Sequence, residues 1–294
     1  METVLNFGSL NLRGGFENKK FELVERACEF RLSILALSDV RIKGQVEDSI
    51  GSYRVFLSGV SRGRANWGVG FLIHKDLESS IICHRFVNER LMWISLKIAN
   101  VTYRFVSVYS PCEGASAILI DDFYNNLNDV IYRKGNENVV ILGDLNARVG
   151  RENPNFTNVI GKFGEDINPN ENGKKLLHFC QSSDLVITNT FFKHKRIHMY
   201  SWENPGQNQK SLLDYVIVEN SLRNFVNDTR VYRSFGLESD HYLVACKLRV
   251  SHSFASKYRK SVKRIKIGKL RNELIANMFK NKLEEKFAKI ELFN

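Results

Sequence analysis

The chain has 294 residues, of which 43% are hydrophobic and 26% charged, as in a globular protein with a sizeable core. Five cysteines, an odd number without a C-x-x-C pair, exclude a disulfide scaffold and a zinc knuckle, and no apolar run reaches the roughly 18 residues of a membrane helix. The net charge of +11 favours a polyanionic partner, although solubility alone would also explain it. The N-terminus has no apolar signal region, which predicts a nuclear or cytoplasmic protein that is not secreted.

Ten short runs have the composition of β-strands, because they are rich in β-branched and aromatic residues and are bounded by Gly, Asn, Ser or Pro. They cover residues 4–11, 34–39, 53–59, 69–75, 91–98, 101–111, 138–144, 185–190, 213–220 and 243–250. Many strands with few helices, and several strands adjacent in sequence, predict an α+β fold with two packed sheets and helices outside them.

Three segments between these runs show the spacing of amphipathic helices, at residues 18–31, 115–134 and 171–184. The predicted buried faces contain Phe21, Val24 and Cys28 in the first segment and Ile118, Phe123, Leu127 and Ile131 in the second.

The composition changes after Val250, where we place the end of the main domain, residues 1–250. Residues 251–294 contain 12 Lys and Arg against 4 Asp and Glu, and therefore carry +8 of the net charge. We expect a basic linker followed by an amphipathic helix in this tail. The tail either binds a phosphate backbone or is a solvated connector.

Polar residues follow or begin several predicted strands. They are Asn11, Asp39, Tyr109, Asp144 with Asn146, Asp214, and Asp240 with His241. Strand alternation sends Asp144 and Asn146 to the same face. If the strands lie side by side, these ends meet, and a cluster of carboxylates requires a cation to offset its repulsion. Oxygen ligands favour Mg²⁺, with Mn²⁺ as the alternative.

This set of groups suits phosphodiester hydrolysis. A divalent ion polarises the phosphoryl oxygen, a carboxylate orients water, and a histidine paired with an acid supplies a proton or a charge. Each residue alone also has a simpler explanation as a turn former, a cap or a packed aromatic. The hypothesis therefore depends on all of them occurring together.

The order of these motifs resembles the endonuclease/exonuclease/phosphatase superfamily, with the deoxyribonuclease-I-like fold, over residues 4–250. The motifs that carry the resemblance are SLNLRG, ILALSDVRIKG, WGVGFLIHKDL, VSVYSP, VVILGDLNARVG, NTFFKHKRIHMYSWENPG, LLDYVIV and SDHYLV. GDLNARVG, the NTFF…SWENPG run and DYVIV most resemble the endonuclease domain of non-LTR (LINE-type) retrotransposons and the related craniofacial development protein 2-like host proteins. The tail is similar to the connector towards a reverse transcriptase in those elements.

The resemblance implies a four-layer αββα sandwich with a metal site at one end. It implies that Asn11, Asp39 and Asp240 hold the metal and that Tyr109 and Asn146 contact the scissile phosphate. Asp144 would orient the water, and His241, steadied by Asp214, would stabilise the transition state or act as acid or base. Trp202 is expected to pack beneath the site.

Two positions depart from the family pattern. Asp39 stands where relatives carry Glu, so its carboxylate falls short by ~1.5 Å along an extended side chain. Leu212 stands where relatives often carry a polar residue, and the resemblance implies that this chain lacks a substrate contact there.

The resulting hypothesis is a monomeric, Mg²⁺-dependent endonuclease that nicks DNA, with RNA as the alternative substrate and no membrane partner. A second hypothesis is a catalytically weakened module of the same fold that binds nucleic acid or protein, supported by Asp39. A third is a phosphatase or exonuclease of the superfamily, against which the retrotransposon-like motifs argue.

Overall fold

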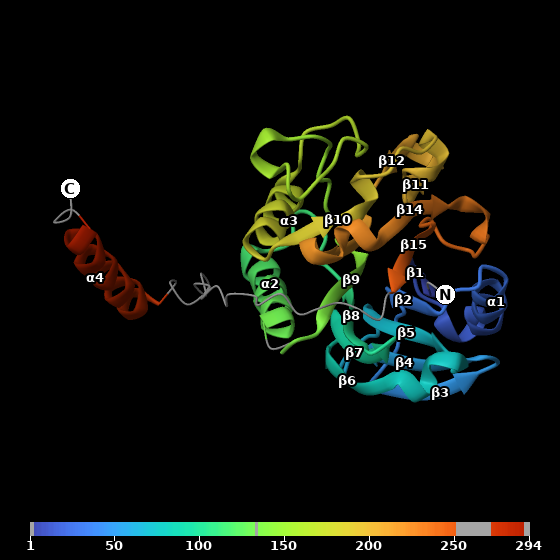
Figure 1. Cartoon of the computed structure of the whole chain (residues 1–294). Helices are drawn as coiled ribbons and strands as arrows, with labels where there is room; N and C mark the ends of the chain where they lie inside the picture. The colour runs from blue at the N-terminus through green and yellow to red at the C-terminus, as the bar shows by residue number, and fades with distance from the viewer. Residues whose placement is uncertain (1–2, 133–134, 251–271, 291–294) are drawn as a thin grey trace. The chain divides into compact units, whose positions relative to one another are not determined.

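The computed structural model describes residues 3–132, 135–250 and 272–290 of the chain (Figure 1). The chain separates into two compact units, Met1–Phe254 and Ala255–Asn294. The domain boundary near Val250 stays a prediction, and the predicted basic linker lies outside the described residues.

The larger unit contains two mixed β-sheets. The first has the strand order β14-β15-β1-β2-β5-β4-β3 and the second the order β10-β13-β9-β8-β7-β6. The strands of the first sheet are β1 (Thr3–Asn11), β2 (Ile34–Ser38), β3 (Gln45–Ile50), β4 (Tyr53–Gly59), β5 (Gly68–His74), β14 (Val226–Tyr232) and β15 (Leu243–Val250). Those of the second are β6 (Ile81–Asn88), β7 (Leu91–Ile98), β8 (Val101–Tyr109), β9 (Asn138–Asp144), β10 (Leu185–Ile187) and β13 (Asp214–Glu219). A separate hairpin pairs β11 (Trp202–Asn204) with β12 (Gln209–Ser211).

Three α-helices cover the outer faces of the two sheets, as Figure 1 shows: α1 on one side, and α2 with α3 on the other. They are α1 (Phe16–Glu29), α2 (Ala117–Tyr132) and α3 (Glu171–Ser182). Short 3₁₀ helices lie at Lys75–Ser80, Pro154–Phe156, Thr188–Thr190, Arg196–His198, Pro205–Gln207, Asn220–Phe225 and Arg233–Phe235. The predicted α+β sandwich of four layers is therefore confirmed.

Three buried apolar clusters hold these layers together. Between the sheets, the rings of Phe7 and Phe105 meet edge to face with centroids 5.4 Å apart. Leu127 of α2 and Ile141 of β9 belong to the cluster beneath α2 and α3, and Leu23 of α1 belongs to the cluster beneath α1. Apolar burial is the main favourable term in folding, and closely packed side chains leave little room for movement. The three clusters therefore hold the ends of the strands in fixed positions.

The predicted helix faces are partly wrong. Helix α1 buries Phe16, Leu23, Val24 and Ala27, but Phe21 is 70% exposed and Cys28 is also exposed. Helix α2 buries Phe123, Leu127 and Ile131, but Ile118 is 64% exposed. A helix turns about 100° per residue, which places Ile118 opposite Leu127 and Phe21 well away from the buried stripe of α1.

The smaller unit contains α4 (Glu273–Ile290), as predicted for the tail. Its apolar side chains Leu274, Met278 and Leu283 are exposed. Among the described residues, no helix is long and apolar enough to cross a membrane.

Candidate active site

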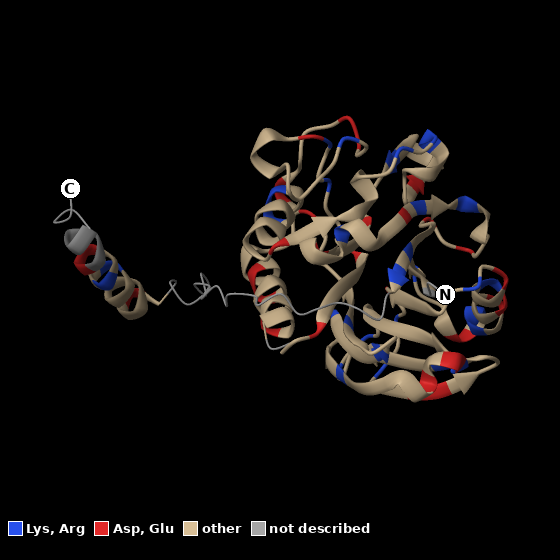
Figure 2. Cartoon of the chain, viewed as in Figure 1, with Lys and Arg blue, Asp and Glu red and all other residues tan. Residues whose placement is uncertain are grey.

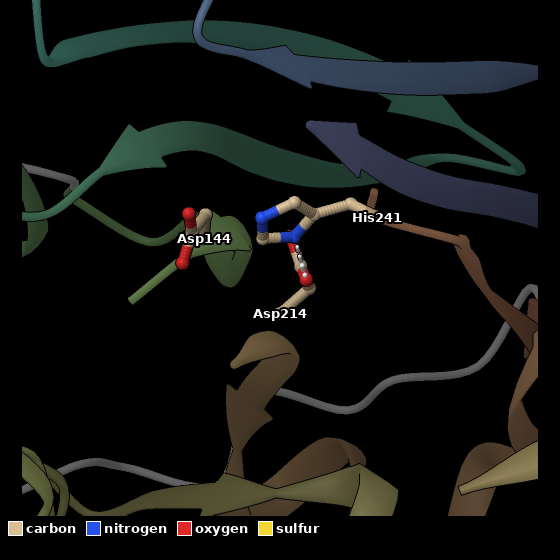
Figure 3. Close-up of side chains that lie close together, drawn as sticks. All are labelled: Asp144, Asp214 and His241. Atoms are coloured by element: carbon tan, nitrogen blue, oxygen red, sulfur yellow. Dashed lines mark hydrogen bonds and ion pairs between the residues drawn. The ribbon is translucent and has the colours of Figure 1, made fainter. Parts of the chain in front are cut away.

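Three side chains from separate parts of the chain converge at one end of the two sheets. Asp144 ends β9, Asp214 begins β13 and His241 lies two residues before the start of β15 (Figure 3). One ligand atom from each lies within 4.8 Å of the other two, and all three residues are buried. Across the described residues this is the one group of three or more such side chains with metal-ligand spacing.

The strand register brings the two acids together. Asp214 is the antiparallel partner of Asp144, and Tyr109 at the end of β8 is its parallel partner. Gly143, with φ of 150°, permits this approach, since a Cβ there would lie 2.0 Å from the carbonyl oxygen of Val108. The apolar residues of β9 thus fix the strand in the core and deliver Asp144 at its end.

His241 and Asp214 form a buried pair. The Nδ1 of His241 lies 2.7 Å from Oδ2 of Asp214. Burial by itself lowers the pKa of His241, but the negative charge and hydrogen bond of Asp214, with Asp144 and Asp240 nearby, raise it to about 9. The imidazole is therefore protonated at neutral pH.

Asp144 is held on both oxygens. The Nδ2 of Asn11 donates to Oδ2 at 2.9 Å, and the backbone N–H of Asn146 donates to Oδ1 at 2.8 Å. Burial and repulsion by Asp214 nevertheless raise the pKa of Asp144 to about 7. In contrast to the oxygens of Asp144, the buried Oδ1 of Asp214 has no hydrogen-bond partner among the described residues. These are the features expected where a divalent cation would bind, since such an ion offsets the repulsion and supplies the partner that Oδ1 lacks.

The residues predicted to hold the metal are not grouped in this way. Asn11 is bonded to Asp144, as described above. Both carboxylate oxygens of Asp39 accept hydrogen bonds from Arg41, and Oδ2 of Asp240 lies 3.3 Å from Nη1 of Arg13. The metal-binding roles of Asn11, Asp39 and Asp240 stay predictions, and the geometry favours Asp144 and Asp214.

The two residues predicted to contact phosphate border the same place. Burial, with the charges of Asp39 and Asp144, raises the pKa of Tyr109 above its ordinary value, so the phenol keeps its proton. The Nδ2 of Asn146 donates to the carbonyl of Ser110 at 2.9 Å. Their roles, like those of Asp144, Asp214 and His241, stay predictions.

Two positioning residues, Ser201 and Ser239, lie in the motifs quoted above, but the sequence alone assigned them no role. The buried Oγ of Ser201 accepts hydrogen bonds from the backbone N–H groups of Leu213 and Asp214, with N···O distances of 3.0 Å, and so fixes the start of β13. The hydroxyl of Ser239 donates to the carbonyl of Asn11 at 2.7 Å and ties the segment before β15 to β1. Only the complete fold brings such residues together.

Two further expectations concern Trp202 and Leu212. The Nε1 of Trp202 donates to Oδ2 of Asp240 at 3.1 Å, and Trp202 forms an isolated antiparallel bridge with His241. Trp202 therefore supports the segment that carries His241. Leu212 is buried in the cluster beneath α2 and α3.

The chain is similar in sequence to known proteins. Residues 103–245 match the family model described as endonuclease-reverse transcriptase. Craniofacial development protein 2 from Bos taurus is 28% identical over 246 residues, which cover 83% of this chain and 40% of that protein. The counterpart from Tragulus javanicus is 26% identical over 245 residues, which cover 83% of this chain and 42% of that protein. The chain thus spans about two fifths of the length of these relatives.

Solved structures with the same fold are more distant in sequence. The endonuclease domain of TRAS1, a telomere-specific non-LTR retrotransposon, aligns with a TM-score of 0.60 at 13% identity, over 84% of this chain and 99% of that one. An AP endonuclease from Leishmania major gives 0.64 at 13% identity, over 84% and 88%. A 3′ phosphatase from Neisseria bound to a product DNA hairpin gives 0.61 at 13% identity, over 83% and 99%. The predicted resemblance to the endonuclease/exonuclease/phosphatase superfamily is confirmed by the family match and by the shared fold of these structures.

Proposed function

We propose that this chain is a phosphodiesterase dependent on a divalent cation, and that it nicks DNA. The observation that carries the proposal is the buried group of Asp144, Asp214 and His241, whose ligand atoms lie within 4.8 Å of one another at the end of a deoxyribonuclease-I-like sandwich. Structural relatives include a retrotransposon endonuclease and a phosphatase bound to DNA, which favours a nucleic-acid substrate.

Asp144 and Asp214 are the residues that would hold the cation, with Mg²⁺ or Mn²⁺ favoured by their oxygen ligands. When bound, the ion supplies charge neutralisation at the phosphoryl oxygen.

The chain's own groups would perform the remaining tasks. His241, protonated at neutral pH, places a positive charge and an N–H donor where negative charge develops on the phosphate. Asp144, which the bound cation would keep ionised, orients the attacking water, and Asp214 keeps the imidazole in place through the Oδ2···Nδ1 contact. Tyr109, which keeps its phenolic proton, and Asn146 hold the non-bridging oxygens.

A basic hollow outside this group supports a polyanionic substrate. It has a volume of about 580 Å³ and is lined by Lys193, His194, Lys195, Ile197, His198 and Arg230. Residues 193–198, which supply all but one of these side chains, precede β11, whose Trp202 donates a hydrogen bond to Asp240. Elsewhere on the larger unit, Lys and Arg are dispersed among acidic residues, as Figure 2 shows. We infer that a DNA strand crosses this hollow beside the site.

The contribution of the hollow to DNA binding can be tested by the salt dependence of DNA affinity. Lys193→Gln/Lys195→Gln should reduce the slope of log K against log salt by about 2, because each neutralised phosphate contributes roughly 0.9. The matched control, Lys97→Gln/Lys247→Gln, removes two exposed lysines from β7 and β15 and should leave the slope unchanged. Equal slopes in all three proteins would remove the hollow from the proposal.

Activity itself is tested with supercoiled plasmid and Mg²⁺. The wild-type protein should produce relaxed circles, and His241→Ala and Asp144→Asn should reduce the rate at least a hundredfold. Chelation of the metal should stop the reaction. Relaxation by the wild type at the rate of His241→Ala would contradict the proposal.

A second candidate is a binding module without nuclease activity, which the pairing of Asp39 with Arg41 favours. In that case the wild type would bind DNA without nicking it in Mg²⁺, and Asp39→Glu would restore cleavage.

A further inference from the structure

Asp39 and Arg41 form a two-point ion pair at the end of β2. Nε of Arg41 lies 3.0 Å from Oδ1 of Asp39, and Nη2 lies 2.8 Å from Oδ2. The carboxylate is buried, with its side chain 4% exposed, whereas that of Arg41 is 45% exposed. Each carboxylate oxygen therefore already accepts a charge-assisted hydrogen bond, which is the strongest arrangement that an acid and an arginine can make.

The position of Arg41 is built into the backbone. Gly14 has φ of 79°, and a Cβ at this residue would lie 2.6 Å from Cδ of Arg41. Because glycine has no Cβ, it leaves a slot for the side chain of Arg41. The N–H of Gly14 donates to the carbonyl of Asp39 at 2.7 Å, so the slot and the acid are fixed to each other. Asp39 itself has φ of 50°, a conformation that is uncommon for a residue other than glycine and that aims its carboxylate at Arg41.

We propose that Asp39 anchors the guanidinium of Arg41 and is not a metal ligand, so that Arg41 supplies at this position the positive charge that a metal ion at Asp39 would otherwise supply. The inference rests on the proposed site in placing the one cation at Asp144 and Asp214. Among the described residues, Nη1 of Arg41 makes no hydrogen bond and is free to donate to a phosphate oxygen.

A metal ion and the guanidinium of Arg41 would compete for the same carboxylate, that of Asp39. A metal ion at Asp39 would lie against the charged guanidinium of Arg41, and the repulsion between the two positive charges would oppose its binding, whereas the two hydrogen bonds on Asp144 come from uncharged donors. Asp39 is also one methylene shorter than the Glu of the family pattern, whereas Mg²⁺ tolerates little displacement of its ligands. The short acid and the arginine two residues later therefore act as one unit.

Mn²⁺ binding, measured by titration calorimetry or by the loss of free Mn²⁺ signal in electron paramagnetic resonance, tests the proposal without an activity assay. Asp39→Asn should bind Mn²⁺ as tightly as the wild type, whereas Asp144→Asn should bind it at least tenfold more weakly. Arg41→Leu should bind Mn²⁺ at least threefold more tightly, because it leaves Asp39 as a buried carboxylate without a cation.

Arg13→Leu is the matched control for Arg41→Leu. Arg13 also pairs with an acid of the site, Asp240, but through a single 3.3 Å contact and with a side chain 63% exposed. Its removal takes away the same charge and should change Mn²⁺ affinity less than Arg41→Leu does. In Asp39→Asn/Arg41→Leu, the gain from Arg41→Leu should disappear. Thermal melting of each variant confirms that it is folded.

A loss of affinity greater than threefold in folded Asp39→Asn would overturn the proposal, as would an unchanged affinity in Arg41→Leu. If the wild type binds no Mn²⁺ but Arg41→Leu does, the pairing of Asp39 with Arg41 is upheld and the metal-dependent function fails.

Discussion

Replacement of Asp214 by Asn should change the charge state of His241. The pair is buried, with Nδ1 of His241 2.7 Å from Oδ2 of Asp214. The pKa of His241 is about 9 because the charge and hydrogen bond of Asp214 outweigh its burial. Without that charge, burial lowers the pKa of His241 and only the smaller effects of Asp144 and Asp240 oppose it, so the pKa should fall from about 9 towards its ordinary 6.5. A change of this size corresponds to about 3 kcal/mol of interaction between the two side chains.

The pKa of His241 can be followed by the pH dependence of its Cε1–H resonance in metal-free protein labelled at its seven histidines, with His241→Gln used for assignment. Asp228→Asn is the matched control, because it removes the acid 2.8 Å from His194 at a partly exposed pair and should leave His241 unchanged. Titration of His241 near 6.5 in both the wild type and Asp214→Asn would refute the electrostatic account of the site.

Three other predictions concern stability. Ser201→Ala leaves the buried N–H groups of Leu213 and Asp214 without an acceptor and should cost about 2 kcal/mol in the free energy of unfolding measured with urea; a change under about 0.5 kcal/mol would show that these groups find other partners. Phe105→Ala should cost about 4 kcal/mol by the same measurement, since it opens a cavity between the sheets; a loss below 1 kcal/mol would contradict tight packing there. The raised pKa of Asp144 contributes stability that is fully present below pH 3.8, the pKa of the unfolded state, and that is lost as the pH rises through about 7. Mg²⁺ should therefore raise the melting temperature more at pH 8, where Asp144 is ionised, than at pH 5. An equal rise at both pH values would count against a cation at Asp144.

The sheets were largely predictable from local sequence, and the exceptions share a cause. All ten predicted runs form strands, and the strands that escaped prediction include β3, β6 and β14, which lie at sheet edges. An edge strand buries only part of its surface and carries polar residues that discourage further pairing, so its periodicity is weak. The sequence QVEDSI of β3, which is mostly exposed, illustrates this.

Some residues of the candidate site could be predicted from the sequence, but one of its ion pairs could not. Asp144, Asp214 and His241 were identifiable because each lies beside an apolar strand in a recognisable motif, and strand register then brings them together. The pairing of Asp39 with Arg41 was not, since it depends on the backbone conformation after β2 and on the slot at Gly14. Short-range sequence patterns predict which residues reach the end of the sandwich, but not which charges pair there.

We propose that one divalent cation binds between the carboxylates of Asp144 and Asp214. Anomalous diffraction from crystals of the protein soaked in Mn²⁺ tests it most directly. We predict a single strong peak within bonding distance of carboxylate oxygens of both residues. A peak at the carboxylate of Asp39, or no peak near Asp144 at saturating Mn²⁺, would contradict the account.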